Sequence, residues 1–359
     1  MKLAAYKYAS PFLICILAWL SFSGHGIITY LPVFWAYIFI PVVELFLKPD
    51  NKNLEEAEEE VAKADPVYDY ILYAVPVALY LLLFQFLASL QQGDLTTIDI
   101  IGRTLSMGLL CGVFGINVGH ELGHRADKFE RMLAKMLLLS SLYMHFYIEH
   151  NKGHHKRVAT HDDPNTAREN EWLFSFFIRS IGGGYFHAWQ IANAEARKKG
   201  FSVIGFQNEM MRFTIVQLLF VLAIFFTFGL VITGYFLAAT LVGILLLETV
   251  NYIEHYGLKR NEVIPGKYER AMPAHSWNSN HVLGRIMLFE LSRHSDHHFL
   301  ASLKYQVLKH HNNSPQLPTG YPGMMILAHI PPLFFYVMRK QMEQYNTMGQ
   351  KVPAYLPVV

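Results

Sequence analysis

The hydrophobic residues of this chain fall into long runs that are separated by polar connectors. A helix needs about 20 mostly apolar residues to cross the hydrocarbon layer of a membrane. Six runs reach or approach this length, and the first of them is short. We therefore predict an all-α integral membrane protein with six spanning helices, at approximately residues 8–22, 27–46, 70–90, 100–119, 213–232 and 235–253.

The placement of lysine and arginine predicts how these helices are oriented. The connectors SGHG, QQGDLTT and TG carry neither residue, whereas the other connectors carry several. Because basic residues collect on the cytoplasmic side of a membrane, we expect both termini and the segments 120–212 and 254–359 to be cytoplasmic. A second run follows the first almost at once, so we expect a retained helix rather than a signal peptide. The whole chain, 1–359, is expected to form one domain.

The composition supports a membrane protein and excludes other classes. Hydrophobic residues make up 52% of the chain and charged residues only 16%, well below the roughly 25% of soluble domains. A net charge of +2 is too small to indicate nucleic acid binding. The two cysteines, Cys15 and Cys111, lie inside apolar runs and form no CxxC motif, which excludes a cysteine-ligated metal site within this chain.

Histidine is the residue that points to chemistry. Four histidine-rich motifs, HELGH, EHNKGHH, NYIEHYGL and RHSDHH, lie just beyond the inner ends of predicted spans or in the inner segments. Within a motif, residues three or four apart share one helix face. We therefore expect His150 and His154 to face the same way, as do the histidines within HELGH and within RHSDHH. The candidate metal ligands are His120, His124, His150, His154, His155, His255, His294, His297 and His298.

The number of these histidines favours a metal centre with two ions. Nine protonated imidazoles would repel one another, and nine unpaired neutral ones would each be costly to bury. Imidazole is a good ligand for iron, zinc, copper and nickel. One tetrahedral zinc uses only three or four ligands, whereas two ions would use four or five each. We expect no ligand role for the other histidines, which are His25, His145, His161, His187, His275, His281, His310, His311 and His329.

Carboxylates beside the motifs are candidates to support the metal ligands. A carboxylate can accept the second ring N–H of a ligating histidine and so fix its tautomer. Glu248 lies within a predicted span, where an ionisable group is either functional or paired with a polar neighbour; both interpretations stay open. The candidates for the supporting role are Glu121, Glu149, Asp162, Asp163, Glu254, Glu290 and Asp296.

HELGH alone also fits a different class of enzyme. It matches H-E-x-x-H, in which two histidines bind zinc and the glutamate acts as general base of a protease. A membrane zinc protease has no use for the other three motifs, so this alternative ranks low. A metal transporter or sensor ranks lower still, because its ligands would lie along a path through the bilayer.

Together, HELGHR, EHNKGHH, NYIEHYGL and RHSDHH resemble the membrane-bound alkane 1-monooxygenases, within the class of histidine-box membrane di-iron desaturases and hydroxylases. The resemblance covers nearly the whole chain and implies two non-haem irons held by the nine histidines. It implies terminal hydroxylation of medium-chain alkanes with O2 in the bacterial inner membrane, with electrons from rubredoxin that an NAD(P)H-dependent reductase supplies. A related enzyme acting on fatty acyl or other alkyl chains is the alternative.

Two further sets of residues follow from this activity. An alkane offers only shape and apolar surface, so we expect a channel between the spans, with chain length set by bulk at its closed end. Candidate lining residues are Trp35, Leu109, Val113, Leu245, Leu246 and Ile253. Rubredoxin must be a separate chain or domain, and an acidic rubredoxin would dock on basic residues unless these only set membrane orientation. The candidates are Lys128, Arg131, Lys135, Lys152 and Arg157.

Overall fold

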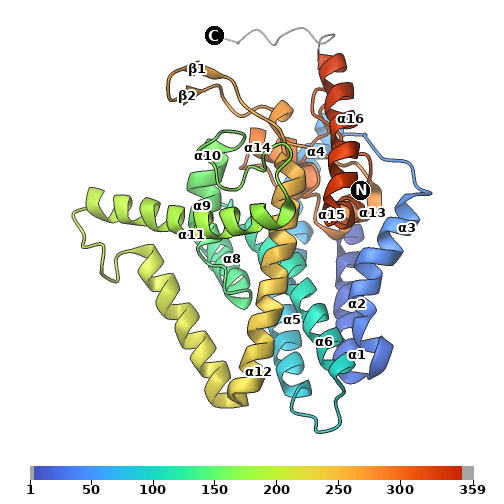
Figure 1. Cartoon of the computed structure of the whole chain (residues 1–359), viewed down its shortest axis with the longest axis vertical. Helices are drawn as coiled ribbons and strands as arrows, with labels where there is room; N and C mark the ends of the chain where they lie inside the picture. Colours follow the sequence, from blue (N-terminus) through green and yellow to red (C-terminus); the bar gives the residue numbers. More distant parts are fainter. Residues whose placement is uncertain (1–3, 350–359) are drawn as a thin grey trace.

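The computed structural model describes residues 4–349 and shows long apolar helices that lie side by side beneath a layer of shorter helices and loops (Figure 1). The tail of the segment predicted to be cytoplasmic, residues 350–359, lies outside the described residues. Five helical stretches are long and apolar enough to cross a membrane. These are Ala5–Ser23, Gly26–Glu44, Val67–Ser89, Thr97–Gly123 and Glu209–His255.

Several of these stretches are composites of differently wound turns. The first joins the 3-10 helix η1 to α1, and the second joins η2, α2, the π-helix η3 and α3. The fourth joins α6, the π-helix η4 and α7, while α5 is a single helix. Their bounds are η1 Ala5–Phe12, α1 Leu13–Ser23, η2 Gly26–Tyr30, α2 Leu31–Phe34, η3 Trp35–Phe39, α3 Ile40–Glu44, α5 Val67–Ser89, α6 Thr97–Leu110, η4 Cys111–Ile116 and α7 Asn117–Gly123.

The last stretch, α12 (Glu209–His255), folds back on itself. Its 47 residues would extend roughly 70 Å as one straight helix, more than twice the thickness of a hydrocarbon core. The helix breaks at Gly229, whose φ of 84° suits glycine, and Thr233 Oγ1 donates to the Gly229 carbonyl at 2.8 Å. Figure 1 shows two arms that meet at this turn. The sequence predicted the turn at residues 233–234, after Ile232. In the structure the chain turns at Gly229 instead, and Gly234 stays within the helix because the positive φ occurs at Gly229.

The segment that follows α7 turns back and packs beside the spanning helices. Helix α8 (Lys128–Ser140) returns alongside α7 and α5, and Ser141 Oγ donates to the Cys111 carbonyl at 3.0 Å, in the middle of the fourth stretch. The close approach depends on small residues: a Cβ at Gly115 would lie 2.7 Å from the hydroxyls of Ser140 and Ser141. Part of segment 120–212 therefore lies beside the apolar bundle rather than beyond its end.

The remaining elements form the layer at the end of the bundle where α7 and α12 finish. Helix α11 is long and lies across the spanning helices in Figure 1, with Phe174, Ile178 and Phe186 exposed. Strands β1 and β2 form one antiparallel hairpin. The bounds are α4 Glu56–Ala64, α9 Phe146–Glu149, η5 His150–His154, α10 His155–Arg157, α11 Leu173–Lys198, β1 Glu262–Ile264, β2 Lys267–Tyr268, η6 Pro273–His275, α13 Val282–Met287, α14 His294–Phe299, η7 Tyr305–Val307, α15 Tyr321–Ala328 and α16 Pro331–Gly349.

Candidate metal centre

The nine histidines of the four motifs meet in two adjacent groups at this end of the bundle. In each group, one ring nitrogen from every member lies within 4.8 Å of the others. The five-histidine group contains His120, His124, His150, His155 and His297. The four-histidine group contains His154, His255, His294 and His298.

The members of the five-histidine group point their Nε2 atoms at one another. His120 and His297 are 2.9 Å apart between these atoms, and His155 lies 3.0 Å from His150 and 3.1 Å from His297. The Nε2 of His124 is buried and has no hydrogen-bond partner among the described residues. His124 and His155 are only partly buried, so this group has the more open surroundings.

The four-histidine group is built in the same way but is buried throughout. The Nε2 of His298 lies 2.9 Å from that of His294 and 3.3 Å from that of His154. His255, at the end of α12, approaches His294 at 3.2 Å. The two groups share elements, because α14 supplies His297 to one and His294 and His298 to the other.

Local helix winding decides which histidine joins which group. His120 and His124, four residues apart, fall in one group, as do His294 and His298. His150 and His154 were expected to face the same way, but they lie in different groups. The reason is the π-helical turn η5, in which residues five apart align, so His150 pairs with His155 instead. His297 was expected to face the same way as His294 and His298, but it also lies in a different group from them, although all three are in the regular α-helix α14.

The arrangement fits a pair of metal ions. Two nitrogens held at right angles on one ion, at about 2.1 Å each, are roughly 3 Å apart, which matches the observed separations. Burial and the neighbouring histidines lower the pKa of His124, His150, His155, His294 and His298 well below the usual value. The pKa of His297 falls to about 3 for the same reasons, burial first. Neutral rings can direct their Nε2 lone pairs at one shared point in each group, which is the arrangement that a bound metal cation requires.

Two of the candidate carboxylates contact the histidines, and both contact the four-histidine group. His154 Nδ1 lies 2.9 Å from Asp163 Oδ2, which also accepts from Thr166 at 2.5 Å. Asp163 therefore orients the ring so that its Nε2 lone pair faces the group. Glu254 places Oε2 at 3.2 Å from His294 Nε2, on the side of the ring that faces the group.

The other candidate carboxylates are engaged elsewhere in the described structure. Glu121 pairs with Arg125 at 2.7 Å, and Glu290 accepts from Tyr8 and pairs with Arg285. Glu149 accepts from Asn165 at 2.6 Å and lies 3.2 Å from His187. Asp296 pairs with His311, and Asp162 is exposed. His187 and His311, which sequence reasoning set aside, are thus partners of carboxylates beside the motifs.

Glu248 lies inside α12 and is hydrogen-bonded to polar side chains from α12 and from other segments. It accepts from Tyr143 at 2.8 Å and from Ser180 and Asn251. The Ser180 hydroxyl also lies 3.0 Å from Asn165 Oδ1, and its one hydrogen is donated to only one of the two acceptors at a time. The Asn165 backbone N–H donates to Asp163 at 3.1 Å. A run of polar contacts therefore extends from Glu248 through Ser180 and Asn165 to Asp163, the carboxylate that orients His154. Sequence reasoning missed Asn165 and Ser180, because neither carries charge nor a motif.

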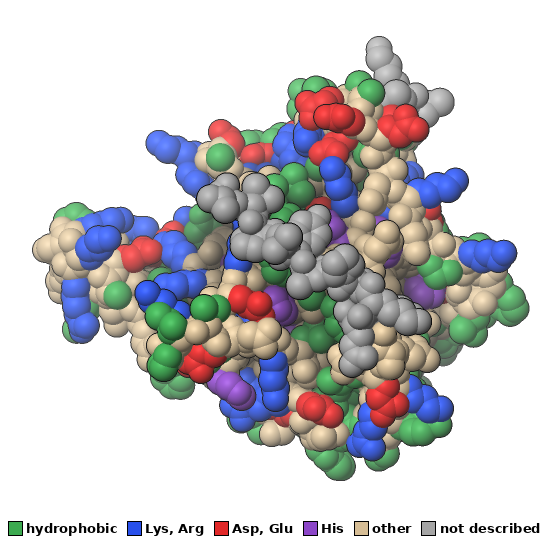
Figure 2. Space-filling model, turned by 90° about the horizontal axis from the view of Figure 1, so that it is seen from above, with side chains coloured by type: hydrophobic (Ala, Val, Ile, Leu, Met, Phe, Trp, Pro, Cys, Tyr) green, Lys and Arg blue, Asp and Glu red, His purple; other side chains and the backbone are tan. Residues whose placement is uncertain are grey.

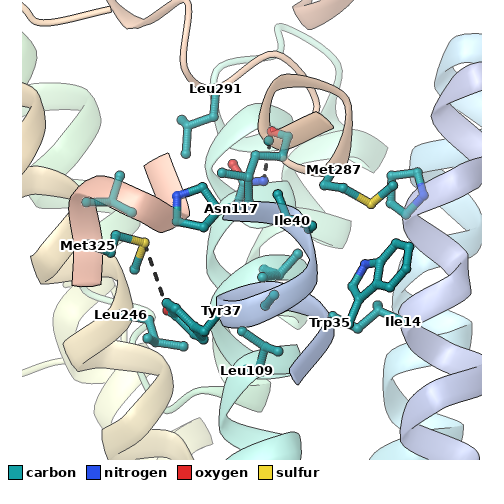
Figure 3. Close-up of a pocket in the computed structure, with 18 of the residues that line it drawn as sticks. Ile14, Trp35, Tyr37, Ile40, Leu109, Asn117, Leu246, Met287, Leu291 and Met325 are labelled. Carbon is teal, nitrogen blue, oxygen red and sulfur yellow. Dashed lines mark hydrogen bonds between the residues drawn. The ribbon is translucent and has the colours of Figure 1, made fainter. Parts of the chain in front are cut away.

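An apolar cavity of about 80 Å³ lies among the spanning stretches, α13 and α15 (Figure 3). Trp35, Leu109, Val113 and Leu246 line it. Leu245 and Ile253 do not, because they pack into a neighbouring core around α15 and α16. Met287, Leu288, Leu291 and Met325 line it as well and were not anticipated.

One helical stretch connects the cavity to the histidines. Leu109, Gly112, Val113 and Asn117 all line the cavity, and His120 and His124 follow on the same stretch. Asn117, His120 and His124 are three and four residues apart, the spacing of one helix face. The π-helical η4 lies between Leu109 and Asn117 and shifts the register so that the face continues from the cavity to the five-histidine group.

The five candidate docking residues differ in exposure and in whether they already contact a side chain of this chain. Lys135 pairs with Glu209 at 2.7 Å and Lys152 with Glu195 at 2.8 Å. Arg157 lies 3.2 Å from His187. Lys128 is exposed and Arg131 half-buried. Figure 2 shows that lysines and arginines are spread over this face of the molecule rather than gathered in one patch.

The fold and the site together define a helical membrane protein with a histidine-rich metal centre. Residues 100–328 match the fatty acid desaturase family. Alkane 1-monooxygenase 2 of Pseudomonas aeruginosa is 37% identical over 308 residues, or 85% of this chain and 82% of that protein. Alkane 1-monooxygenase 2 of Alcanivorax borkumensis is 36% identical over 315 residues, or 87% and 82%. The xylene/toluene monooxygenase hydroxylase component of Pseudomonas putida is 26% identical over 259 residues, or 71% and 69%.

The chain belongs to the fatty acid desaturase family and, within it, to the alkane 1-monooxygenases. It is therefore an oxidoreductase of the monooxygenase type, and its family and histidine groups indicate iron. This confirms the resemblance drawn from the four motifs. Membership of this family also argues against a zinc protease. A zinc protease would leave most of the nine histidines in the two groups without a role.

Proposed function

We propose that this protein hydroxylates the terminal carbon of medium-chain n-alkanes at a di-iron centre, with O2 and electrons from rubredoxin. The observation that carries the proposal is an apolar cavity lined by the helical stretch that carries His120 and His124, in a structure that gathers nine imidazoles into two adjacent groups. The relatives named alkane 1-monooxygenase support the same activity.

The nine histidines would hold one iron in each group. Bound iron would activate O2, which amino acid side chains alone cannot do. The protein's own contribution is to bury the imidazoles, to orient His154 through Asp163, and to keep water away from the cavity side. Glu254, beside His294, is placed either to bind a metal or to balance its charge.

The cavity binds its substrate by shape. An alkane forms no hydrogen bond, and burial of each CH2 from water contributes roughly 0.8 kcal/mol, but far less when the chain comes from lipid. Selectivity therefore depends on which chain lengths the cavity accommodates. With Leu109 toward one end and Asn117 and Leu291 toward the other (Figure 3), one chain end would be directed to the five-histidine group.

The membrane placement follows from the distribution of charge. The connectors free of lysine and arginine lie at the end of the bundle opposite the histidines, so we place the centre and both termini on the cytoplasmic side of a bacterial inner membrane. Six crossings, with the two arms of α12 counted separately, are consistent with this placement. Rubredoxin, reduced by an NAD(P)H-dependent reductase, would then reach the centre from the cytoplasm.

Rubredoxin docking is proposed at the basic residues near α8. Lys128 and Arg131 are the strongest candidates, because the other three are already paired within the chain. An acidic partner would be steered by these charges, and its association would weaken as salt rises.

The direct experiment is turnover with defined components. Purified protein loaded with ferrous iron, supplied with reduced rubredoxin, O2 and octane, should form 1-octanol, and metal analysis should find iron rather than zinc. Failure to form 1-octanol in iron-loaded protein would contradict the proposal. Octanoate serves as the competing substrate for the fatty acyl alternative. We expect it to be the poorer substrate, because no lysine or arginine within residues 4–349 lines the cavity to pair with its carboxylate.

A further inference from the structure

Three side chains put polar atoms into the otherwise apolar lining of the cavity. They are Trp35, Tyr37 and Asn117. Tyr37 donates to the thioether of Met325 at 3.9 Å, and Trp35 carries only an N–H donor. Asn117 is the one with an amide, and it lies toward the end of the cavity opposite Leu109 (Figure 3).

The hydrogen bond of Asn117 fixes how its amide is turned. Its Nδ2 donates to the Leu288 carbonyl at 3.0 Å. A carbonyl can only accept, so the amide nitrogen must face Leu288 and the oxygen Oδ1 is the atom left over. No described residue donates to Oδ1. Asn117 keeps 7% of its surface exposed while lining the cavity, so the cavity contains an acceptor without a partner.

This acceptor lies beside the five-histidine group. Asn117 precedes His120 by three residues on the same helix α7, which places the two side chains on one face within one turn. A chain end that approaches His120 along this helix face would therefore pass Asn117. A hydrocarbon end has nothing to donate there, whereas a hydroxyl on the same carbon has one O–H.

We propose that Asn117 Oδ1 accepts a hydrogen bond from the hydroxyl of the primary alcohol, and that this residue makes the cavity distinguish product from substrate. The inference rests on the proposed hydroxylation of alkanes. It adds a binding site for the product at the reacting end of the cavity. The alcohol is then held with its oxygen next to α7 after it forms, and its release competes with binding of the next alkane.

The test compares 1-octanol with octane in wild-type protein and in Asn117→Leu, in lipid nanodiscs. Equilibrium binding is measured on metal-free protein, and inhibition of octane turnover by 1-octanol is measured on iron-loaded protein. We expect the variant to bind 1-octanol roughly three- to tenfold more weakly, the range that one hydrogen bond contributes. Its affinity for octane should stay the same or rise. Equal weakening for alcohol and alkane would overturn the inference and leave Asn117 as a structural tie to Leu288.

A matched variant and a matched ligand complete the design. Val113→Ala changes the size of the same cavity without its polarity, so it should shift octane and 1-octanol alike. Should Asn117→Leu fail to fold, wild-type protein alone decides the matter, because 1-fluorooctane has the size of 1-octanol but no O–H. We expect 1-octanol to bind more tightly by the same factor, and equal binding would overturn the inference. Absence of octane hydroxylation would instead contradict the proposed function.

Discussion

The two histidine groups lie side by side but have different surroundings. The five-histidine group is partly open, lies at the end of the cavity's helix face, and has no carboxylate in contact among the described residues. The four-histidine group is fully buried and is backed by Asp163 and Glu254. Under the proposed function, we expect the five-histidine position to admit substrate and oxygen, and the four-histidine position to bind its metal more tightly with fewer imidazoles.

The largest effect is expected from removing an imidazole. His298→Ala leaves the four-histidine group with three members, whereas His124→Ala leaves the other group with four. Both variants should lose more than about 100-fold in activity, beyond the 10- to 100-fold typical of outer partners. Iron content should separate them: the His298 variant loses one iron per chain, and the His124 variant retains more. Equal iron loss in both variants would contradict the expectation that the two groups bind iron with different strength.

Asp163→Asn should produce the next largest effect. The amide still reaches His154 but carries no charge, so the four-histidine group should bind iron roughly 10- to 100-fold more weakly. Chelator competition followed by iron analysis measures this, with release of one iron per chain at lower chelator concentration. Asp162→Asn is the matched control, because Asp162 is exposed and next in sequence. Identical behaviour of the two variants would mean that Asp163 does not support His154.

A smaller and more selective effect is expected at the cavity. Trp35→Ser removes a bulky side chain from the lining, which should shift the preferred substrate toward longer alkanes by several-fold. Iron content should not change, because Trp35 contacts neither histidine group. Relative rates with octane, decane and dodecane measure the shift. An unchanged profile across this and other widening variants would argue against the cavity as the substrate site.

The smallest effect concerns the surface. Changing both Lys128 and Arg131 to Ala should raise the KM for rubredoxin a few-fold at low salt and reduce the salt dependence of turnover. The kcat at saturating rubredoxin should stay the same. If wild-type turnover at limiting rubredoxin is independent of salt, docking by charge is excluded.

Much of the fold and the centre could be predicted because the signals are local. Apolar runs predicted the spanning stretches, and the four motifs identified all nine histidines that the structure brings together. The division into five and four could not be predicted. For the histidines of EHNKGHH it depends on the π-helical turn at His150–His154, and for those of RHSDHH it depends on how α14 packs between the two groups.

The remaining differences have the same origin in tertiary structure. Leu245 and Ile253 carry the right chemistry for the cavity, but they pack into the core around α15 and α16 instead. The side chains of Glu149 and Asp296 form their hydrogen bonds and ion pairs with residues 13 or more positions away in the chain, which no local pattern indicates. Hydrophobicity and spacing therefore predict which groups gather, and long-range packing decides how they pair.

The most direct test of the account is an experimental structure of the iron-loaded protein with anomalous scattering measured at the iron absorption edge. The account predicts two iron peaks, one surrounded by the Nε2 atoms of the five-histidine group and one by those of the four-histidine group. A single metal peak, or peaks that scatter as zinc, would contradict it.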